Sequence, residues 1–108
     1  MDSPSEEMDF DSALKHVSSK NTKFVWLGVE PKERIGELLE IDKSRIISID
    51  PEQLLYMDDK ELRKLENHVF LCYHGNTSGF MARHLRKAHG LNSYHVKGGT
   101  AGIIGDIL

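Results

Sequence analysis

The chain has 108 residues, of which 39% are hydrophobic and 29% charged, and its formal net charge is −3 at pH 7. This length suits one domain with its own hydrophobic core, and the proportions of hydrophobic and charged residues are typical of an ordinary soluble protein. No apolar run approaches the roughly 20 residues that span a bilayer, and no signal peptide is visible. The single cysteine, Cys72, excludes an intramolecular disulfide and fits a reducing compartment. We therefore expect a cytoplasmic protein with no membrane partner.

Short strand-forming runs alternate with amphipathic segments along the chain. Residues 1–9 are acidic and predict either a poorly ordered tail or a short edge strand, and residues 10–108 form the domain. In chain order, the patterns predict a helix at 11–18, a strand at 23–28, a helix at 31–39, a strand at 45–49, helices at 51–56 and 59–65, a strand at 69–71, a helix at 79–89, a strand at 93–96 and a helix at 100–107. This alternation predicts an α/β fold with a central, mainly parallel sheet and helices on both faces.

Cys72 directly follows the apolar strand at 69–71, and ligands of such sheets bind at the carboxyl ends of strands. Gly75 tolerates positive φ, so the chain can turn between Cys72 and Ser78, and Ser78 or Thr77 is expected to cap the next helix. Backbone N–H groups that curl toward the sulfur, together with the helix N-terminus, favour a thiolate or a persulfide anion. The local pattern also fits a buried, inert cysteine, so both interpretations stay open at this point.

Two strings resemble a known family. Cys-Tyr-His-Gly-Asn-Thr-Ser at 72–78 closely resembles the active-site loop of rhodanese-like sulfurtransferases, and is nearest to the small single-domain bacterial members. Tyr-His-Val-Lys-Gly-Gly-Thr-Ala at 94–101 resembles the strand and Gly-Gly turn that follow the active-site helix in that family. The resemblance implies a single rhodanese-like domain, with Gly98-Gly99 close to the active-site face.

The resemblance also implies a function, that of a thiosulfate sulfurtransferase-like enzyme. Cys72 would take sulfane sulfur from thiosulfate or a persulfide donor, hold it as a persulfide, and pass it to cyanide, a thiol or a thioredoxin-type acceptor. The residues of the loop that would bind the substrate are Tyr73, His74, Gly75, Asn76, Thr77 and Ser78. No cofactor or metal is implied. His74 could contact the substrate or support the thiolate, or it could simply point to solvent.

Some positions depart from the family pattern. Thr77 stands where many rhodaneses carry an arginine, Leu27-Gly28-Val29 replaces an Asp-x-Arg stretch, and residues 36–49 lack the Gly-His-Ile-Pro-Gly-Ala segment. These departures keep an alternative open, a non-catalytic rhodanese-fold binding or regulatory module. A sulfur carrier or relay protein would show the same loop. A phosphatase or arsenate reductase is disfavoured, because it needs an arginine at the sixth position after the cysteine, where Ser78 stands.

The distribution of charge and the spacing of the histidines indicate which classes of ligand the protein can bind. Residues 68–108 are net positive and residues 1–67 net negative, which favours a small anionic donor near Cys72, although the basic side chains also fit the solvated face of a helix. No basic stripe with interleaved aromatic residues suggests nucleic-acid binding. The six histidines show no paired metal-ligand spacing, so we expect no metal site.

Overall fold

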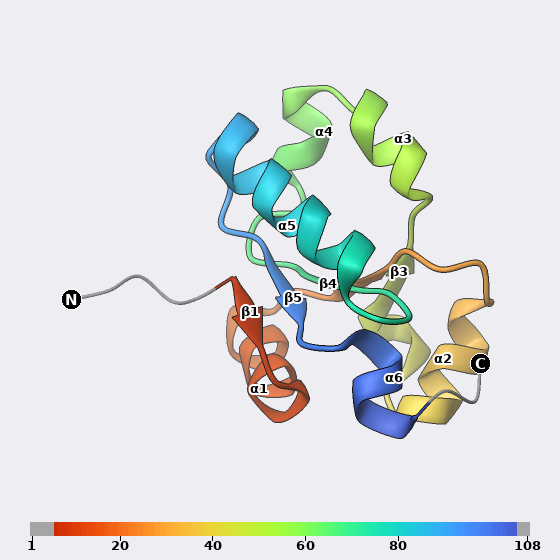
Figure 1. The fold of residues 1–108 in the computed structure, drawn as a ribbon. Coiled ribbons are helices and arrows are strands. Elements are labelled where there is room, and N and C mark those ends of the chain that lie inside the picture. The colour runs from red at the N-terminus through yellow and green to blue at the C-terminus, as the bar shows by residue number, and fades with distance from the viewer. Residues whose placement is uncertain (1–5, 106–108) are drawn as a thin grey trace.

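The strand-forming runs of the sequence come together in one central sheet (Figure 1). The computed structural model describes residues 6–105. Its strands are β1 (Glu7–Met8), β2 (Phe24–Trp26), β3 (Ile46–Ser48), β4 (Val69–Leu71) and β5 (Tyr94–Val96). They lie in the order β1-β5-β4-β2-β3, and every neighbouring pair in this five-stranded sheet is parallel. The carboxyl ends of all these strands therefore lie at the same edge of the sheet.

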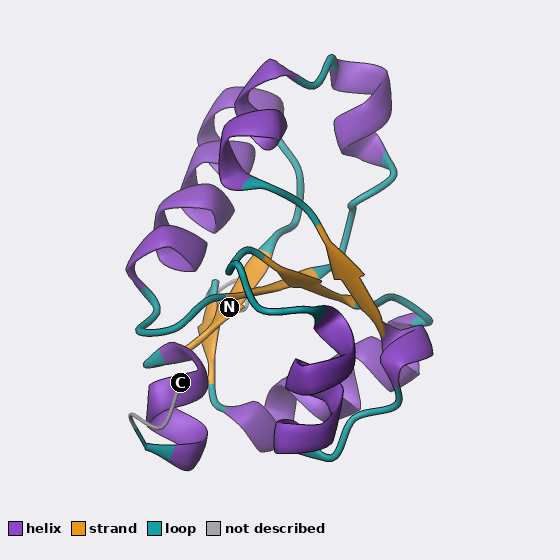
Figure 2. Cartoon of the chain, turned by 90° about the vertical axis from the view of Figure 1, so that its right-hand side faces the viewer, coloured by secondary structure: helices purple, strands orange, loops and turns teal. Residues whose placement is uncertain are grey.

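Helices cover both faces of the sheet, as Figures 1 and 2 show. One face carries α1 (Phe10–Lys20), α2 (Lys32–Leu39) and α6 (Gly99–Ile104). The other face carries α3 (Pro51–Tyr56), α4 (Asp59–Arg63) and α5 (Asn76–His89). A short 3-10 turn at Lys43–Arg45 precedes β3. The predicted α/β fold, with a parallel sheet between two layers of helices, is confirmed.

Alternation along the strands divides the core into two halves. In β2, Phe24 and Trp26 face the α1 side whereas Val25 faces the α5 side, and all three are fully buried. In β4, Phe70 belongs to the α5 side, between two residues that face the α1 side. Successive side chains of a strand point to opposite faces, so a strand covered on both faces must be apolar throughout. Cys72 packs in the same half of the core as Phe70.

The start of α5 differs from the prediction. The helix begins at Asn76, three residues before the expected Gly79, and its N-cap is Gly75 rather than Ser78 or Thr77. Gly75 has φ 90, a left-handed conformation that lets the chain enter the helix directly after a very short turn. Ser78 lies within the first turn and is fully buried. The predicted end is confirmed, because Gly90 follows the helix with φ 67 and its N–H bonds to the carbonyl of Arg86.

Near the two ends of the described residues lie the edge strand β1 and the short helix α6. Of the residues for which a tail or an edge strand was open, Glu7–Met8 form the edge strand β1 beside β5, and residues 1–5 lie outside the described residues. The helix predicted at 100–107 begins at Gly99 and ends at Ile104, and residues 106–108 lie outside the described residues. None of the described helices combines the length and the apolar character needed to cross a bilayer.

Two buried histidines are expected to make the fold sensitive to mild acid. His68 and His95 are only 9% and 4% exposed, and burial lowers the pKa of both side chains below the ordinary 6.5. At His95 the Glu7 carboxylate opposes this effect and Arg83 reinforces it. Below this pH the unfolded chain therefore binds protons that the folded chain does not. The free energy of unfolding is highest above about pH 6.5, where both histidines are neutral in either state, and it decreases as the pH drops below that value.

Urea unfolding at several values between about pH 7.5 and 5 tests this expectation, in a window above the titration of ordinary carboxylates. His95→Gln replaces the histidine with a polar side chain of similar size that does not titrate. The free energy of unfolding of this variant should therefore depend less steeply on pH than that of the wild type. A free energy of unfolding that stays constant across this window in the wild type would contradict the prediction.

Candidate active site

Cys72 lies at the carboxyl end of β4, the central strand of the sheet. On one side, the N–H of Leu27 donates to the carbonyl of Leu71 at 2.9 Å, so the segment after β2 runs beside Cys72. On the other side, the N–H of Thr100 donates to the carbonyl of Cys72 at 2.9 Å. Segments from three parts of the chain therefore meet at this cysteine.

The sulfur of Cys72 is surrounded by hydrogen-bond donors from the 72–78 loop. The N–H groups of Gly75 and Ser78 donate to Sγ at 3.2 and 3.3 Å. The hydroxyl of Ser78 lies 3.2 Å from Sγ, where either atom can donate. Cys72 is 5% exposed and Ser78 is fully buried. Donors held in place by a fixed backbone stabilise negative charge on the atom they face, so this geometry suits a sulfur anion.

The first turn of α6 forms hydrogen bonds with the start of the 72–78 loop. The N–H of Ala101 donates to the carbonyl of Tyr73 at 2.8 Å, and the hydroxyl of Thr100 lies 3.3 Å from the same oxygen. Gly99 makes this approach possible: its φ is +62, and a Cβ there would lie 2.4 Å from the carbonyl oxygen of Cys72. The expected placement of the Gly-Gly turn beside the loop is confirmed.

Tyr73 points away from the sulfur and toward the segment after β2. Its ring packs edge-on against Trp26, with centroids 5.1 Å apart. Its hydroxyl accepts a hydrogen bond from the N–H of Val29 at 3.3 Å and donates to the carboxylate of Glu30 at 3.5 Å. The indole N–H of Trp26 in turn donates to the carbonyl of Glu30 at 2.8 Å. Tyr73 therefore connects the 72–78 loop to residues 27–30.

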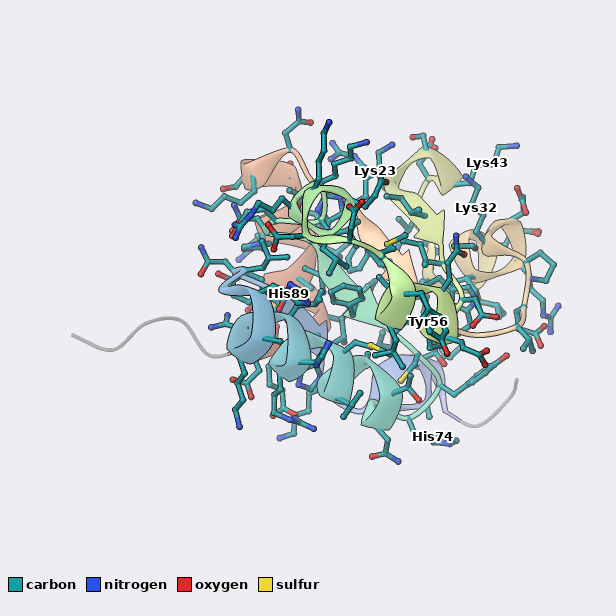
Figure 3. The ribbon with its side chains drawn as sticks, turned by 90° about the horizontal axis from the view of Figure 1, so that it is seen from above. Lys23, Lys32, Lys43, Tyr56, His74 and His89 are labelled. Carbon is teal, nitrogen blue, oxygen red and sulfur yellow. The ribbon has the colours of Figure 1, made fainter. Side chains whose placement is uncertain are left out.

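A pocket of about 270 Å³ opens beside Cys72 between these two segments. The residues that line it are Leu27, Gly28, Val29, Cys72, Tyr73, His74, Asn76 and Thr77. Two of the predicted site residues, Gly75 and Ser78, are not among the lining residues and reach the sulfur through hydrogen bonds instead. His74 is exposed and lies at the edge of the molecule in Figure 3. Which of these residues contact a substrate stays a prediction.

Sequence reasoning missed the pocket wall that residues 27–29 form. The Leu27-Gly28-Val29 stretch counted only as a departure from a family pattern, yet it forms one side of the pocket. The available signal was the pair of strong apolar strands, because two central parallel strands bring the segments after them to the same edge. Gly28 also has a packing reason, since a Cβ there would lie 2.2 Å from the Trp26 ring.

Within residues 6–105, no cluster of three or more histidine, cysteine, aspartate or glutamate side chains could hold a metal ion. The candidate site consists of one thiol, the groups that hydrogen-bond to it, and the pocket beside it.

Comparisons with known proteins place the fold but not the activity. No family model matches the sequence, and no curated protein matches it closely enough to count as a relative. Among solved structures, the crystal structure of SSP1007 from Staphylococcus saprophyticus subsp. saprophyticus is similar, with a TM-score of 0.52 and 16% sequence identity. The similarity covers 89% of this chain and 93% of that chain. At this level of identity the two chains share a fold, which carries no conclusion about function.

Proposed function

We propose that this protein is a rhodanese-type sulfurtransferase that moves sulfane sulfur from a donor to a thiol through a persulfide on Cys72. One observation carries the proposal: Sγ of Cys72 lies beside an open pocket and receives hydrogen bonds from the N–H groups of Gly75 and Ser78. A nucleophilic thiol needs stabilisation of its anion and access for its substrate, and this site offers both. The resemblance of the 72–78 and 94–101 strings to rhodaneses supports the same chemistry.

Transfer of sulfur to Cys72 is a displacement in which one S–S bond forms and another breaks. With thiosulfate, the Cys72 thiolate attacks the outer sulfur, a new S–S bond forms, and the bond between that sulfur and the sulfonate breaks. Sulfite leaves with the electron pair, and Cys72 keeps a terminal persulfide anion. The N–H groups of Asn76 and Thr77 begin α5 and have no acceptor one turn earlier in the helix, and in this proposal they donate to the new terminal sulfur.

The second half of the reaction requires an acceptor from outside the chain. Cys72 is the only cysteine in the sequence, so no resolving thiol can displace the persulfide within the same molecule. Cyanide, a low-molecular-weight thiol or a thioredoxin-type thiol can remove the outer sulfur and regenerate the Cys72 thiolate. A cytoplasmic location is part of this proposal, because such thiols are reduced there.

Intact mass spectrometry tests the proposal directly. The folded protein is incubated briefly with thiosulfate or with cysteine persulfide, beside Cys72→Ser and beside the wild type unfolded in urea. We expect the folded wild type to gain the mass of one sulfur atom, faster than the unfolded chain, and to lose it on reduction with dithiothreitol. The Cys72→Ser variant should gain nothing.

The proposal is wrong if neither donor adds sulfur to the folded protein faster than to the unfolded chain. If Cys72 in the folded protein also resists alkylation, the thiol is buried and inert, and the alternative of a rhodanese-fold binding or regulatory module takes its place. Labelling that persists in Cys72→Ser would contradict the assignment of the nucleophile.

A further inference from the structure

The pocket beside Cys72 contains no permanent cation. Among the described residues that line it, none is lysine or arginine, and His74 is the one basic side chain. The wall opposite the loop is formed by Leu27, Gly28 and Val29, which carry no charge. Thr77, which lines the pocket from the side of the loop, is neutral and exposed.

Two arginines on neighbouring elements are directed elsewhere. Arg34 forms an ion pair with Glu30, with Nε 3.4 Å from Oε2. Arg83 turns toward β5: its Nη1 and the ring of His95 both lie within 3.4 Å of the point where a Cβ on Gly79 would stand. Neither arginine lines the pocket, and the carboxylate of Glu30 accepts a hydrogen bond at 3.5 Å from the hydroxyl of Tyr73, one of the lining residues.

These charges bear on the choice of sulfur donor. Thiosulfate is a compact dianion, so its sulfonate must enter the pocket when Cys72 attacks the adjoining sulfur, and the sulfite that leaves is also a dianion. Removing such a group from water is costly unless a cation or several strong donors replace the water. The free N–H groups at the start of α5 are neutral donors and replace this water less well than a guanidinium would.

An alkyl persulfide, R–S–SH, makes smaller demands on the same pocket. The Cys72 thiolate attacks the outer sulfur, the bond between the two donor sulfurs breaks, and R–S⁻ leaves with the electron pair while the proton stays on the transferred sulfur. The reacting sulfur atoms carry only one negative charge throughout, whereas the thiolate and thiosulfate together carry three. The carbon chain of R can lie against the apolar side chains of Leu27 and Val29, which line the pocket, and Val29 is 90% exposed and therefore accessible to it.

We propose that the site takes its sulfur from alkyl persulfides in preference to thiosulfate. This inference rests on the proposed sulfurtransferase function and specifies its donor. The apolar wall and the lack of a fixed cation select against the dianion, and the exposed Val29 favours a donor with a carbon substituent.

The test compares the second-order rate constants for the addition of sulfur to Cys72 by cysteine persulfide and by thiosulfate. Each reaction is quenched at a series of times, and the modified fraction is measured by intact mass spectrometry. The measurement is made at about pH 8 for both donors. Each rate is divided by the rate for the same chain unfolded in urea, which removes the intrinsic reactivity of the two donors. We expect the normalised rate for the persulfide to exceed that for thiosulfate by about tenfold or more, the effect of one missing charge-assisted contact.

Substitutions that introduce a positively charged side chain should shift the preference of the pocket toward thiosulfate. Thr77→Arg and Val29→Lys each place a positive charge at exposed positions of the pocket, and should raise the thiosulfate-to-persulfide rate ratio about tenfold. Leu14→Lys adds the same charge on α1, which covers the other face of the sheet, and should leave the ratio unchanged.

The inference is overturned if wild-type protein accepts thiosulfate as readily as the persulfide after normalisation, or if neither Thr77→Arg nor Val29→Lys changes the ratio. A different result would overturn the function itself: if neither donor labels folded Cys72 faster than the unfolded chain, the site does not catalyse sulfur transfer. The two failures are therefore distinguishable in one experiment.

Discussion

Replacing Gly99 with alanine is expected to slow persulfide formation on Cys72 by about 100-fold, because displacement of a reacting group by about 1 Å costs that much. The added Cβ would lie 2.4 Å from the carbonyl oxygen of Cys72 and 2.7 Å from that of Tyr73. Both contacts are with backbone atoms, so the 72–78 loop or the first turn of α6 must move. Movement also weakens the hydrogen bonds from Thr100 and Ala101, which hold the loop.

Gly90→Ala provides a matched control for this substitution. Gly90 has φ +67, close to the +62 of Gly99, but a Cβ there meets nothing within 4 Å. Both variants therefore carry the cost of a left-handed alanine, about 1–2 kcal/mol, whereas only Gly99→Ala adds the collision with the loop. Urea unfolding should show a larger loss of stability for Gly99→Ala, and persulfide formation should stay at the wild-type rate in Gly90→Ala. Equal stabilities and equal rates in the two variants would contradict this account of Gly99.

The parts of the fold that local patterns determine could be predicted from the sequence. The strand Val69–Leu71 is apolar throughout, and Gly90 ends α5 where its left-handed conformation is needed, so both followed from residue type alone. The short turn after Cys72 was also expected from Gly75. The start of α5 was not, because a serine in a helical sequence looks like an N-cap. Ser78 instead directs its hydroxyl to the sulfur of Cys72, a contact that depends on how tightly the turn closes.

The second wall of the site could not be predicted from local patterns. Residues 27–30 approach Cys72 only because β2 and β4 are neighbours in the sheet, and strand order depends on the packing of the whole domain. The same holds for the contact between Tyr73 and Glu30, which are 43 residues apart in the chain. The loop sequence therefore predicts a reactive sulfur, whereas the pocket that would choose its donor appears only in the folded chain.

The site is built largely from backbone groups, which bears on how its sequence can vary. The N–H groups of Gly75, Ser78, Thr100 and Ala101 supply the hydrogen bonds to Cys72 and Tyr73. Such contacts require a backbone conformation rather than a particular side chain, except where a Cβ would collide, as at Gly99. A fold shared at 16% identity is compatible with this kind of construction, since conformation can persist while side chains change.

Ser78→Ala is expected to slow the alkylation of Cys72 by iodoacetamide at neutral pH by about tenfold to 100-fold, because a hydrogen bond to a charged group contributes about 1.5–3 kcal/mol. The Ser78 hydroxyl lies 3.2 Å from Sγ and is fully buried, so water cannot replace it. The N–H of residue 78 still donates to Sγ in the variant, and alanine fits the space that serine leaves. The effect therefore measures what the hydroxyl adds to the stability of the sulfur anion. The same substitution should slow persulfide formation by a similar factor.

Ser93→Ala separates this effect from the general loss of a buried hydroxyl. Ser93 is also fully buried, but its hydroxyl donates to the carbonyl of Ala82 at 2.6 Å. It precedes β5, at the amino-terminal edge of the parallel sheet, whereas Cys72 lies at the carboxyl-terminal edge. We expect Ser93→Ala to lower the free energy of unfolding by about 0.5–1.5 kcal/mol, the typical net contribution of one hydrogen bond, and to leave alkylation at the wild-type rate. If alkylation slowed equally in both serine variants, or in neither, the Ser78 hydroxyl would have no specific part in stabilising the Cys72 anion.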